Sequence, residues 1–307
     1  MDERDVKAAA ARIEGRVRRT PILTLDAGEA APVPVVFKLE QLQHTGSFKP
    51  RGAFNTLLAG EVPPAGVICA SGGNHGIAVA HAARELGVRC EVFLPLSSAP
   101  VKVQLLRALG AAVRQVGSVY AEAFEAMAAR RAETGAMLVH AYDQPATVAG
   151  QGTLFREWLE QDPQLTTLLV AVGGGGLIGG ALAALGHRLR LVAVEPRHAP
   201  TLAVALDADA PIDVAVSGLA ADSLGARRIG EIGFALVRHH GVVSLTVGDD
   251  EIRAAQLWLW QHARIAAEPG GAAALAPLLS RAYRPGAAER VGVLICGGNT
   301  DPAGLGG

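Results

Sequence analysis

Short apolar runs alternate with longer, alanine-rich stretches along most of the chain. The short runs predict strands at residues 35–38, 66–69, 90–94, 112–115, 137–140, 167–172, 191–194, 242–247 and 291–296. Between them, stretches with the length and composition of helices lie at residues 77–86, 101–109, 120–133, 148–160 and 250–262. Strands that alternate with helices of this length favour parallel pairing and right-handed crossover connections. The pattern therefore predicts a doubly wound α/β fold.

The overall composition narrows the class of protein. The chain has 307 residues, of which 50% are hydrophobic and 19% charged, which is enough apolar material for a large core. With 28 Lys and Arg against 29 Asp and Glu, and 4% aromatic residues, nothing favours a surface for nucleic acid or acidic lipid. The sequence shows no apolar signal segment and no long uncharged apolar run, so we expect a cytoplasmic protein without a membrane span.

Ligands of doubly wound sheets bind at the turns that follow the carboxyl ends of the strands, and four such turns hold unusual residues. The first reads SFKPRGA, with Ser47 as the expected N-cap of a helix and Pro50 in its first turn. Lys49 then lies at a helix start, where the positive end of the helix dipole disfavours a cation. Such a lysine has reason to lose its charge and to form a Schiff base with an aldehyde. A solvated surface lysine is the alternative.

The second turn reads SGGNHG, from Ser71 to Gly76, and opens the helix predicted at residues 77–86. Two glycines beside Ser71 and Asn74 bring several backbone N–H groups together at a helix start. This arrangement suits an anion such as a carboxylate. In the alternative interpretation, Asn74 only caps the helix and the glycines only turn the chain.

The third turn is a run of glycines between a predicted buried strand and a helix, and its four successive glycines indicate that a phosphate approaches the backbone closely. Gly174, Gly176 and Gly179 also match the pattern GxGxxG, and Glu195 follows about 20 residues later. A nicotinamide-dependent oxidoreductase therefore stays an alternative.

The fourth turn begins with Cys296, directly after the last core strand, where it is either a small core residue or a side chain facing a ligand. The other two cysteines, Cys69 and Cys90, lie far from it in the sequence. This spacing argues against a disulfide framework and against a structural zinc site.

The order of these turns resembles the fold-type II pyridoxal-phosphate (PLP) enzymes, most closely the serine/threonine dehydratase and serine racemase family. The matching segments are KLEQLQHTGSFKPRGA, ASGGNHGIA, HAYDQPATVAGQGT, GGGGL, VEP, AEPGGA and CGGNTD. The resemblance implies a tryptophan synthase beta-like fold, in which two doubly wound parallel-sheet lobes hold the cofactor between them. Residues 1–60 and 141–307 would form the large cofactor-binding domain, and residues 61–140 the small domain.

The resemblance also implies a role for each residue of the four turns. Lys49 would hold PLP through a Schiff base and act as the catalytic base, Phe48 would pack against the pyridine ring, and Asn74 would hydrogen-bond its phenolic oxygen. Cys296 would face the pyridine nitrogen. The phosphate would be held by backbone N–H groups of Gly173, Gly174, Gly175, Gly176 and Leu177. The carboxylate of the substrate would be bound by Ser71, Gly72, Gly73, Asn74 and His75.

The implied activity is a PLP-dependent dehydratase, or ammonia-lyase, that converts a β-hydroxy amino acid such as L-threonine or L-serine to a 2-oxo acid and ammonia. A serine racemase-type activity is the alternative, but racemases of this family place a serine where this chain has Gly72, which carries no acid.

The family's cation site is matched by Glu195 and Ala199 but not by Thr201, so we assign no metal ligand. We expect a homodimer. The preferred amino acid stays open, with Tyr142, His44 and Thr45 as candidate neighbours of its side chain.

Overall fold

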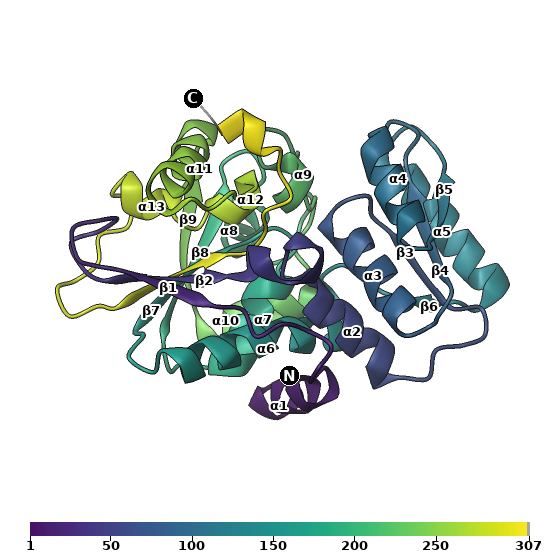
Figure 1. Ribbon diagram of the computed structural model, residues 1–307, viewed down its shortest axis with the longest axis horizontal. Helices are drawn as coiled ribbons and strands as arrows, with labels where there is room; N and C mark the ends of the chain where they lie inside the picture. Colours follow the sequence, from purple (N-terminus) through teal and green to yellow (C-terminus); the bar gives the residue numbers. More distant parts are fainter. Residues whose placement is uncertain (306–307) are drawn as a thin grey trace.

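The computed structural model describes residues 1–305 and contains two β-sheets, each covered by helices (Figure 1). The larger sheet has the strand order β1-β2-β10-β7-β8-β9, and β1 is its one antiparallel strand within the described residues. Its strands are β1 (Ile22–Leu25), β2 (Val35–Leu39), β7 (Thr167–Ala171), β8 (Arg190–Pro196), β9 (Val243–Val247) and β10 (Val291–Ile295). The strands β2, β7 and β10 are buried throughout, as expected for parallel strands covered on both faces.

The smaller sheet is parallel, with the order β5-β4-β3-β6, and lies on the right in Figure 1. Its strands are β3 (Val67–Ala70), β4 (Cys90–Leu94), β5 (Ala112–Gln115) and β6 (Met137–Leu138). All four lie within residues 61–140, the segment predicted for the small domain. The boundaries of the two domains stay a prediction.

Helices connect the strands and cover both sheets. Those before or around the smaller sheet are α1 (Glu3–Arg12), α2 (Lys49–Ala59), α3 (Asn74–Glu85), α4 (Pro100–Ala108) and α5 (Tyr120–Thr134). The others are α6 (Pro145–Gln161), α7 (Gly176–Leu185), α8 (Thr201–Ala208), α9 (Ala221–Leu224), α10 (Glu231–His240), α11 (Asp249–Ala263), α12 (Pro269–Ala272) and α13 (Ala276–Leu279). Short 3-10 helices lie at Glu40–Leu42, His44–Gly46 and Pro302–Leu305.

The predicted α/β class with parallel sheets is confirmed, and most predicted elements agree with the structure to within a few residues. The strand β1 was not predicted, because its four residues are neither a continuous apolar run nor a clear alternation. It pairs with β2 in the antiparallel direction, which alternating strands and helices did not predict. The helix expected at residues 77–86 begins earlier, at Asn74. Within residues 1–305, no helix is both long enough and apolar enough to cross a membrane.

Candidate active site

Most of the residues predicted from the four turns come together at the carboxyl ends of β3, β7 and β10. Of those predicted to bind the substrate carboxylate, Asn74 lines the pocket found there, whereas Ser71, Gly72, Gly73 and His75 do not. One pocket is lined by Phe48, Lys49, Asn74, Gly173, Gly174, Gly175, Gly176, Leu177 and Cys296. The same pocket is also lined by Tyr142, Ser223 and Glu268. Parallel strands bring their carboxyl ends to one edge of a sheet, so the turns that follow them meet there.

Lys49 is the first residue of α2 and is positioned by the last core strand. The backbone N–H of Phe48 donates to the carbonyl of Cys296 over 3.1 Å, and Ser47 forms an isolated β-bridge with Gly297. The Nζ atom of Lys49 donates to the carbonyl of Ala141 over 2.9 Å and lies 5.0 Å from the centre of the Phe48 ring. The lysine amine is therefore held at the end of β10 by contacts from three segments.

The expected N-cap role of Ser47 is wrong. The helix begins at Lys49, its N-cap residue is Phe48, and no side chain caps it. The buried hydroxyl of Ser47 has no hydrogen-bond partner among the described residues. The extended bridge between Ser47 and Gly297 fixes the backbone before the helix starts, and it moves the cap one residue along the chain.

The electrostatics of the pocket favour an uncharged amine. Burial lowers the pKa of Lys49 to about 8, against the opposing effects of Cys296 and Glu268. The main cause of the shift is therefore burial, whereas the sequence suggested the helix dipole. Burial also raises the pKa of the Cys296 thiol, which donates to the carbonyl of Gly270 over 3.4 Å and stays neutral at pH 7. This lowered pKa leaves a minor but useful fraction of the amine neutral at pH 7, and the neutral amine is the form that reacts as a nucleophile and accepts a proton.

The glycine run forms the N-terminus of α7. Gly175 is the N-cap residue, with a φ of +85° that favours glycine, and no side chain caps the helix. The carbonyl of Gly173 accepts from the Thr201 hydroxyl over 2.6 Å, and that of Gly174 accepts from the N–H of Gly230 over 3.0 Å. Because no side chain caps the helix, the N–H groups of its first turn are left for an anion at the positive end of the helix.

The glycine run predicted that a phosphate lies close to the backbone, but part of the space beside these glycines is filled by the protein's own Tyr142. A Cβ atom on Gly174 would lie 2.2 Å from Cδ1 of Tyr142, and one on Gly176 would lie 2.8 Å from the backbone of the same residue. Packing against Tyr142 is thus enough to require glycine at positions 174 and 176, so the glycine run alone does not demonstrate a phosphate site. Tyr142 lines the pocket, whereas His44 and Thr45, the other two candidates for the substrate side chain, do not.

The SGGNHG turn leads into α3, whose N-cap residue is Gly73 and which no side chain caps. The hydroxyl of Ser71 accepts from the N–H of Gly73 over 3.3 Å. The ring of His75 is buried, and burial lowers its pKa to about 3, so it is neutral at pH 7. Its Nε2 lies 2.8 Å from the carbonyl of Val139, which requires Nε2 to carry the proton. The ring of His75 is therefore neutral and already hydrogen-bonded, and its backbone N–H is the group that can bind an anion.

Glu268 is a pocket residue to which sequence reasoning assigned no role. It is buried and accepts a hydrogen bond from Nδ2 of Asn74 over 2.5 Å, while Oδ1 of Asn74 accepts from Asn299 over 2.7 Å. Burial raises the pKa of Glu268 to about 7, against the lowering effects of Asn74 and Lys49. The signal that could have found it is the single carboxylate of the AEPGGA segment. Asn74 keeps one further amide N–H for a ligand.

A substitution of Glu268 has a predictable effect on stability and pH. A carboxyl group whose pKa is raised in the folded state stabilises the fold at low pH, and this stability is lost as pH rises from about 4.5 to about 7. In Glu268→Gln this loss is absent, and the pKa of Lys49 falls because the nearby anion is gone. Thermal unfolding measured from pH 4 to 8 checks the first effect, and the pH–rate profile checks the second.

Glu61→Gln, a change of the same kind on an exposed residue, is the matched control and should follow the wild-type pH dependence. If Glu268→Gln and the wild type lose stability equally over this pH range, Glu268 does not titrate near 7.

The buried carboxylate of Glu195 makes its hydrogen bonds within the protein. Its Oε1 accepts from the N–H of Leu202 over 2.6 Å and from the Thr201 hydroxyl over 3.1 Å, and its Oε2 accepts from Ala203 over 2.8 Å. The carboxylate therefore caps the start of α8, which removes the support that it gave to a dinucleotide site. In the part of the chain that the structure describes, no group of three or more His, Cys, Asp or Glu side chains is arranged to hold a metal ion.

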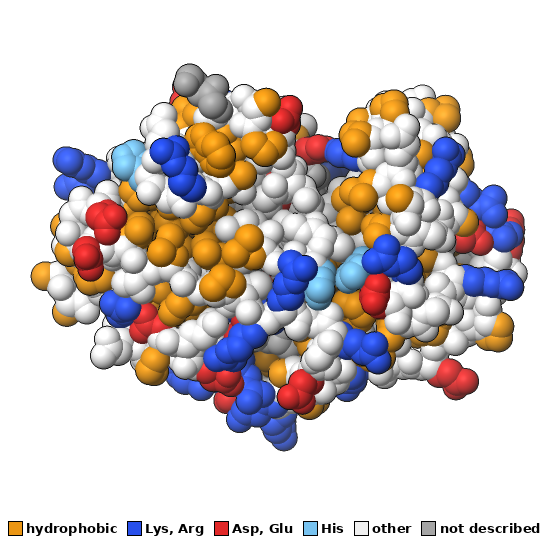
Figure 2. Space-filling model, viewed as in Figure 1, with side chains coloured by type: hydrophobic (Ala, Val, Ile, Leu, Met, Phe, Trp, Pro, Cys, Tyr) orange, Lys and Arg blue, Asp and Glu red, His pale blue; other side chains and the backbone are white. Residues whose placement is uncertain are grey.

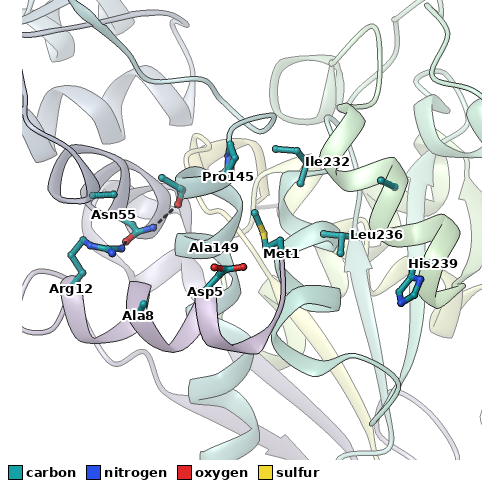
Figure 3. Close-up of a pocket in the computed structure, with 13 residues that line it drawn as sticks. Met1, Asp5, Ala8, Arg12, Asn55, Pro145, Ala149, Ile232, Leu236 and His239 are labelled. Atoms are coloured by element: carbon teal, nitrogen blue, oxygen red, sulfur yellow. Dashed lines mark hydrogen bonds between the residues drawn. The ribbon is translucent and has the colours of Figure 1, made fainter.

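A wider pocket, of about 750 Å³, lies away from these residues, between α1, α2, α6 and α10 (Figure 3). Its walls are mostly alanines and aliphatic side chains, with Asp5, Arg12, Asn55 and His239 at the edges. Arg12 donates to Asn55, whose amide in turn donates to the carbonyl of Ala146 over 2.6 Å. None of the four predicted turns contributes a residue to this wider pocket. The reactive side chains line the narrower pocket instead.

Two helix-covered β-sheets, with a partly buried lysine beside uncapped helix starts at their strand ends, suit an enzyme that holds an anionic, amine-reactive group. The family described as "Pyridoxal-phosphate dependent enzyme" matches residues 13–297. The chain belongs to this family, and the nicotinamide-dependent alternative is wrong.

Individual relatives agree with this assignment. Phenylserine dehydratase of Ralstonia pickettii is 38% identical over 95% of this chain and 91% of its own length. L-threonine ammonia-lyase of Geobacter sulfurreducens is 36% identical over 96% of this chain and 75% of its own length. The structure of maize serine racemase superposes with a TM-score of 0.93 at 31% identity, covering 99% of this chain and 95% of that one. The chain is thus a PLP-dependent enzyme related to dehydratases and to serine racemases.

The residues of the narrow pocket fit PLP. The amine of Lys49 suits its aldehyde, and the uncapped start of α7 suits its phosphate. The neutral thiol of Cys296 is a weak donor and suits an unprotonated pyridine nitrogen. Each group that the cofactor presents therefore has a chemically matched partner in the pocket.

Proposed function

We propose that this enzyme is an ammonia-lyase that removes water from a β-hydroxy amino acid such as L-threonine or L-serine. The Cα proton and the β-hydroxyl leave together as water, and the resulting enamine tautomerises and hydrolyses to a 2-oxo acid and ammonia. The observation that carries the proposal is the partly buried Lys49 amine, whose pKa is lowered to about 8, in a pocket shared with the turn in which Gly72 bears no acid.

When bound, PLP supplies an electron sink that stabilises negative charge at the Cα of an amino acid. The Lys49 amine is the group that takes the proton from Cα, and its lowered pKa keeps a useful fraction of it unprotonated at pH 7. The open N–H groups at the start of α3 bind the substrate carboxylate, which fixes the orientation of Cα. Phe48, Asn74, Cys296 and the residues 173–177 hold the cofactor in the roles stated above.

Racemisation needs a second acid that returns a proton to the other face of Cα, and Gly72 has no side chain to do so. We expect the wild type to release a 2-oxo acid while forming little of the D-amino acid. In Gly72→Ser the new hydroxyl should raise the ratio of racemisation to elimination, by about tenfold or more for a positioned general acid. Chiral chromatography of the amino acid left after partial turnover measures this ratio.

The backbone of Gly72 can accept a side chain, because its φ is not in the left-handed region. A Cβ atom there would lie 3.0 Å from Cδ2 of the buried Leu94, so this side chain must shift slightly. Gly72→Ala, which adds the Cβ without the hydroxyl, is the control and should not racemise. Abundant D-serine from the wild type would favour the racemase alternative and would make Ser71 the candidate for the second acid.

The direct test of the proposed reaction is a panel of β-hydroxy amino acids, namely L-serine, L-threonine, L-threo-3-hydroxyaspartate and L-threo-phenylserine. Release of ammonia and of the 2-oxo acid in equal amounts is the expected result for at least one of them. Turnover without either product would contradict the proposal. The panel also decides the preferred side chain, for which Tyr142 is the neighbour that the pocket provides.

We further propose that the chain works as a homodimer in the cytoplasm. Figure 2 shows a broad hydrophobic area over α11, β1 and β2, and partly exposed apolar side chains there include Ile22, Leu23, Trp258 and Trp260. A contiguous apolar area of this kind is typical of a protein interface. Trp260→Glu should convert a dimer to a monomer in light scattering, whereas Arg264→Glu, close by but polar already, should not. A monomeric wild type would contradict the proposal.

A further inference from the structure

Three histidines gather on the surface where two helices end, away from the active-site pocket. His187 follows α7 by two residues, and His239 and His240 are the last two residues of α10. The ring centres of His187 and His240 are 4.6 Å apart, those of His239 and His240 also 4.6 Å, and those of His187 and His239 6.4 Å. Neither the proposed reaction nor the family's turns use these residues.

Two of the rings already present nitrogen atoms to each other. Nδ1 of His240 lies 3.2 Å from Nε2 of His187. Two imidazole nitrogens bound to one zinc ion at about 2.0–2.1 Å with a tetrahedral angle are about 3.3–3.4 Å apart. The observed separation is therefore close to the one that a shared metal ion needs. The two nitrogens are hydrogen-bonded to each other, and a tilt of both rings would break this bond and turn both lone pairs toward one point.

The three histidines lie near several arginines, but their electrostatic surroundings still favour a bound cation. The helices α7 and α10 both direct their carboxyl ends, which carry partial negative charge, toward the cluster. At the end of α7, Arg188 already donates to the carbonyls of Ala184 and Leu185, so α10 is the helix with the freer end. The nearby arginines are each paired with an acid, Arg188 with Glu3, Arg190 with Glu289 and Arg238 with Asp209.

We propose that His187, His240 and His239 form a surface site for a divalent transition-metal ion of the zinc class. His187 and His240 supply the two nitrogens that already face each other, and the exposed ring of His239 turns to supply the third. The described residues hold no ready-made group of three ligands, so this rotation is part of the proposal. Imidazole ligands suit zinc, copper and nickel, whereas magnesium prefers oxygen.

The consequence of such a site would be structural. The helices α7 and α10 are in contact along their length, and Gly233 of α10 lies against Gly175 and Gly179 of α7. A metal ion bridging their carboxyl ends would join them at the end opposite the glycine run. The ion binds only the folded arrangement, so it would raise the melting temperature of the enzyme.

The test uses the untagged, PLP-loaded enzyme after dialysis against a chelator. Equilibrium dialysis with Zn²⁺ should show about one ion per chain, with a rise in melting temperature that a chelator reverses. His187→Gln and His240→Gln should each weaken Zn²⁺ binding by at least about tenfold, since even changes around a ligand cost that much. Their visible absorbance and their activity without Zn²⁺ should match the wild type, which shows that they are folded.

His198→Gln is the matched control, because His198 is an exposed histidine paired with an acid, Asp249, elsewhere on the surface. It should bind Zn²⁺ as the wild type does. The proposal is overturned if His187→Gln and His240→Gln bind Zn²⁺ like the wild type, if His198→Gln loses the site, or if Mg²⁺ raises the melting temperature equally.

Discussion

Lys49→Ala should abolish both the yellow colour of the enzyme and its activity. Covalent attachment of PLP needs a lysine amine, and Lys49 is the lysine that lines the pocket among the described residues. The same amine is the proposed base at Cα, so the loss of rate should be at least about 10³-fold, within the range for a positioned base. Visible absorbance, borohydride reduction followed by peptide mapping, and ammonia release measure the three effects separately.

Lys102→Ala is the control, because Lys102 lies on α4 and pairs with Asp222 at the surface. This variant should keep the colour and the borohydride-labelled peptide. If Lys49→Ala still gives a labelled peptide after borohydride treatment, another lysine holds the cofactor. If it is colourless yet fully active, the proposed lyase mechanism fails as well.

Arg51→Met should have the largest effect on stability. Arg51 is 1% exposed, and its guanidinium donates to both carboxylate oxygens of Glu40, over 2.9 and 2.7 Å, and to Glu157 over 3.0 Å. Lys38, which is also buried, donates to the other oxygen of Glu157 over 2.5 Å. Methionine keeps the length of the side chain but leaves Glu40 buried without its partner, which costs about 3–5 kcal/mol. Urea unfolding followed by circular dichroism measures the change.

The double variant Arg51→Met with Glu40→Gln should recover part of this loss, because it removes the unpaired buried charge. Arg84→Met removes an exposed ion pair with Glu85 and should cost less than about 1 kcal/mol. If Arg51→Met costs no more than Arg84→Met, the buried cluster does not stabilise the fold.

The cluster also predicts the response to acid. Burial alone would raise the pKa of Glu40, but Arg51 and Lys38 hold it below its usual value of 4.5. A carboxylate whose pKa is lowered stabilises the fold above its unfolded pKa, and this stability is lost as pH falls through the folded value. The wild type should therefore lose stability below about pH 4.5, and Arg51→Met should lack this part of the acid transition.

The turns that carry the chemistry could be predicted from the sequence because their constraints are local. A φ of +85° at Gly175 favours glycine wherever it occurs, and a helix start without a side-chain cap is visible as SGGN or GGGG after an apolar run. The order of these turns was specific enough to indicate the family and the cofactor, while the role of Lys49 stays a prediction. The alternation of strands and helices was enough for the α/β class.

The contacts that tune the site come from the tertiary structure, because they join residues far apart in the chain. Glu268 meets Asn74, 194 positions away, and nothing near either residue marks the pair. The ion pairs of Arg51 bring together three separate segments, and the SFKPRGA motif alone assigned it no role.

The same contrast between local sequence and tertiary contacts applies to Lys49, Ser47 and Tyr142. The sequence alone placed an amine at the start of a helix, but its lowered pKa comes mainly from burial, which requires the packed fold. The helix start after Ser47 is shifted by a bridge to Gly297, and the space left by Gly174 is taken by Tyr142. Local sequence thus determined which backbone shapes and reactive groups this protein has. Only the tertiary structure decided their charge and their neighbours, because desolvation and ion pairing depend on what packs around a group.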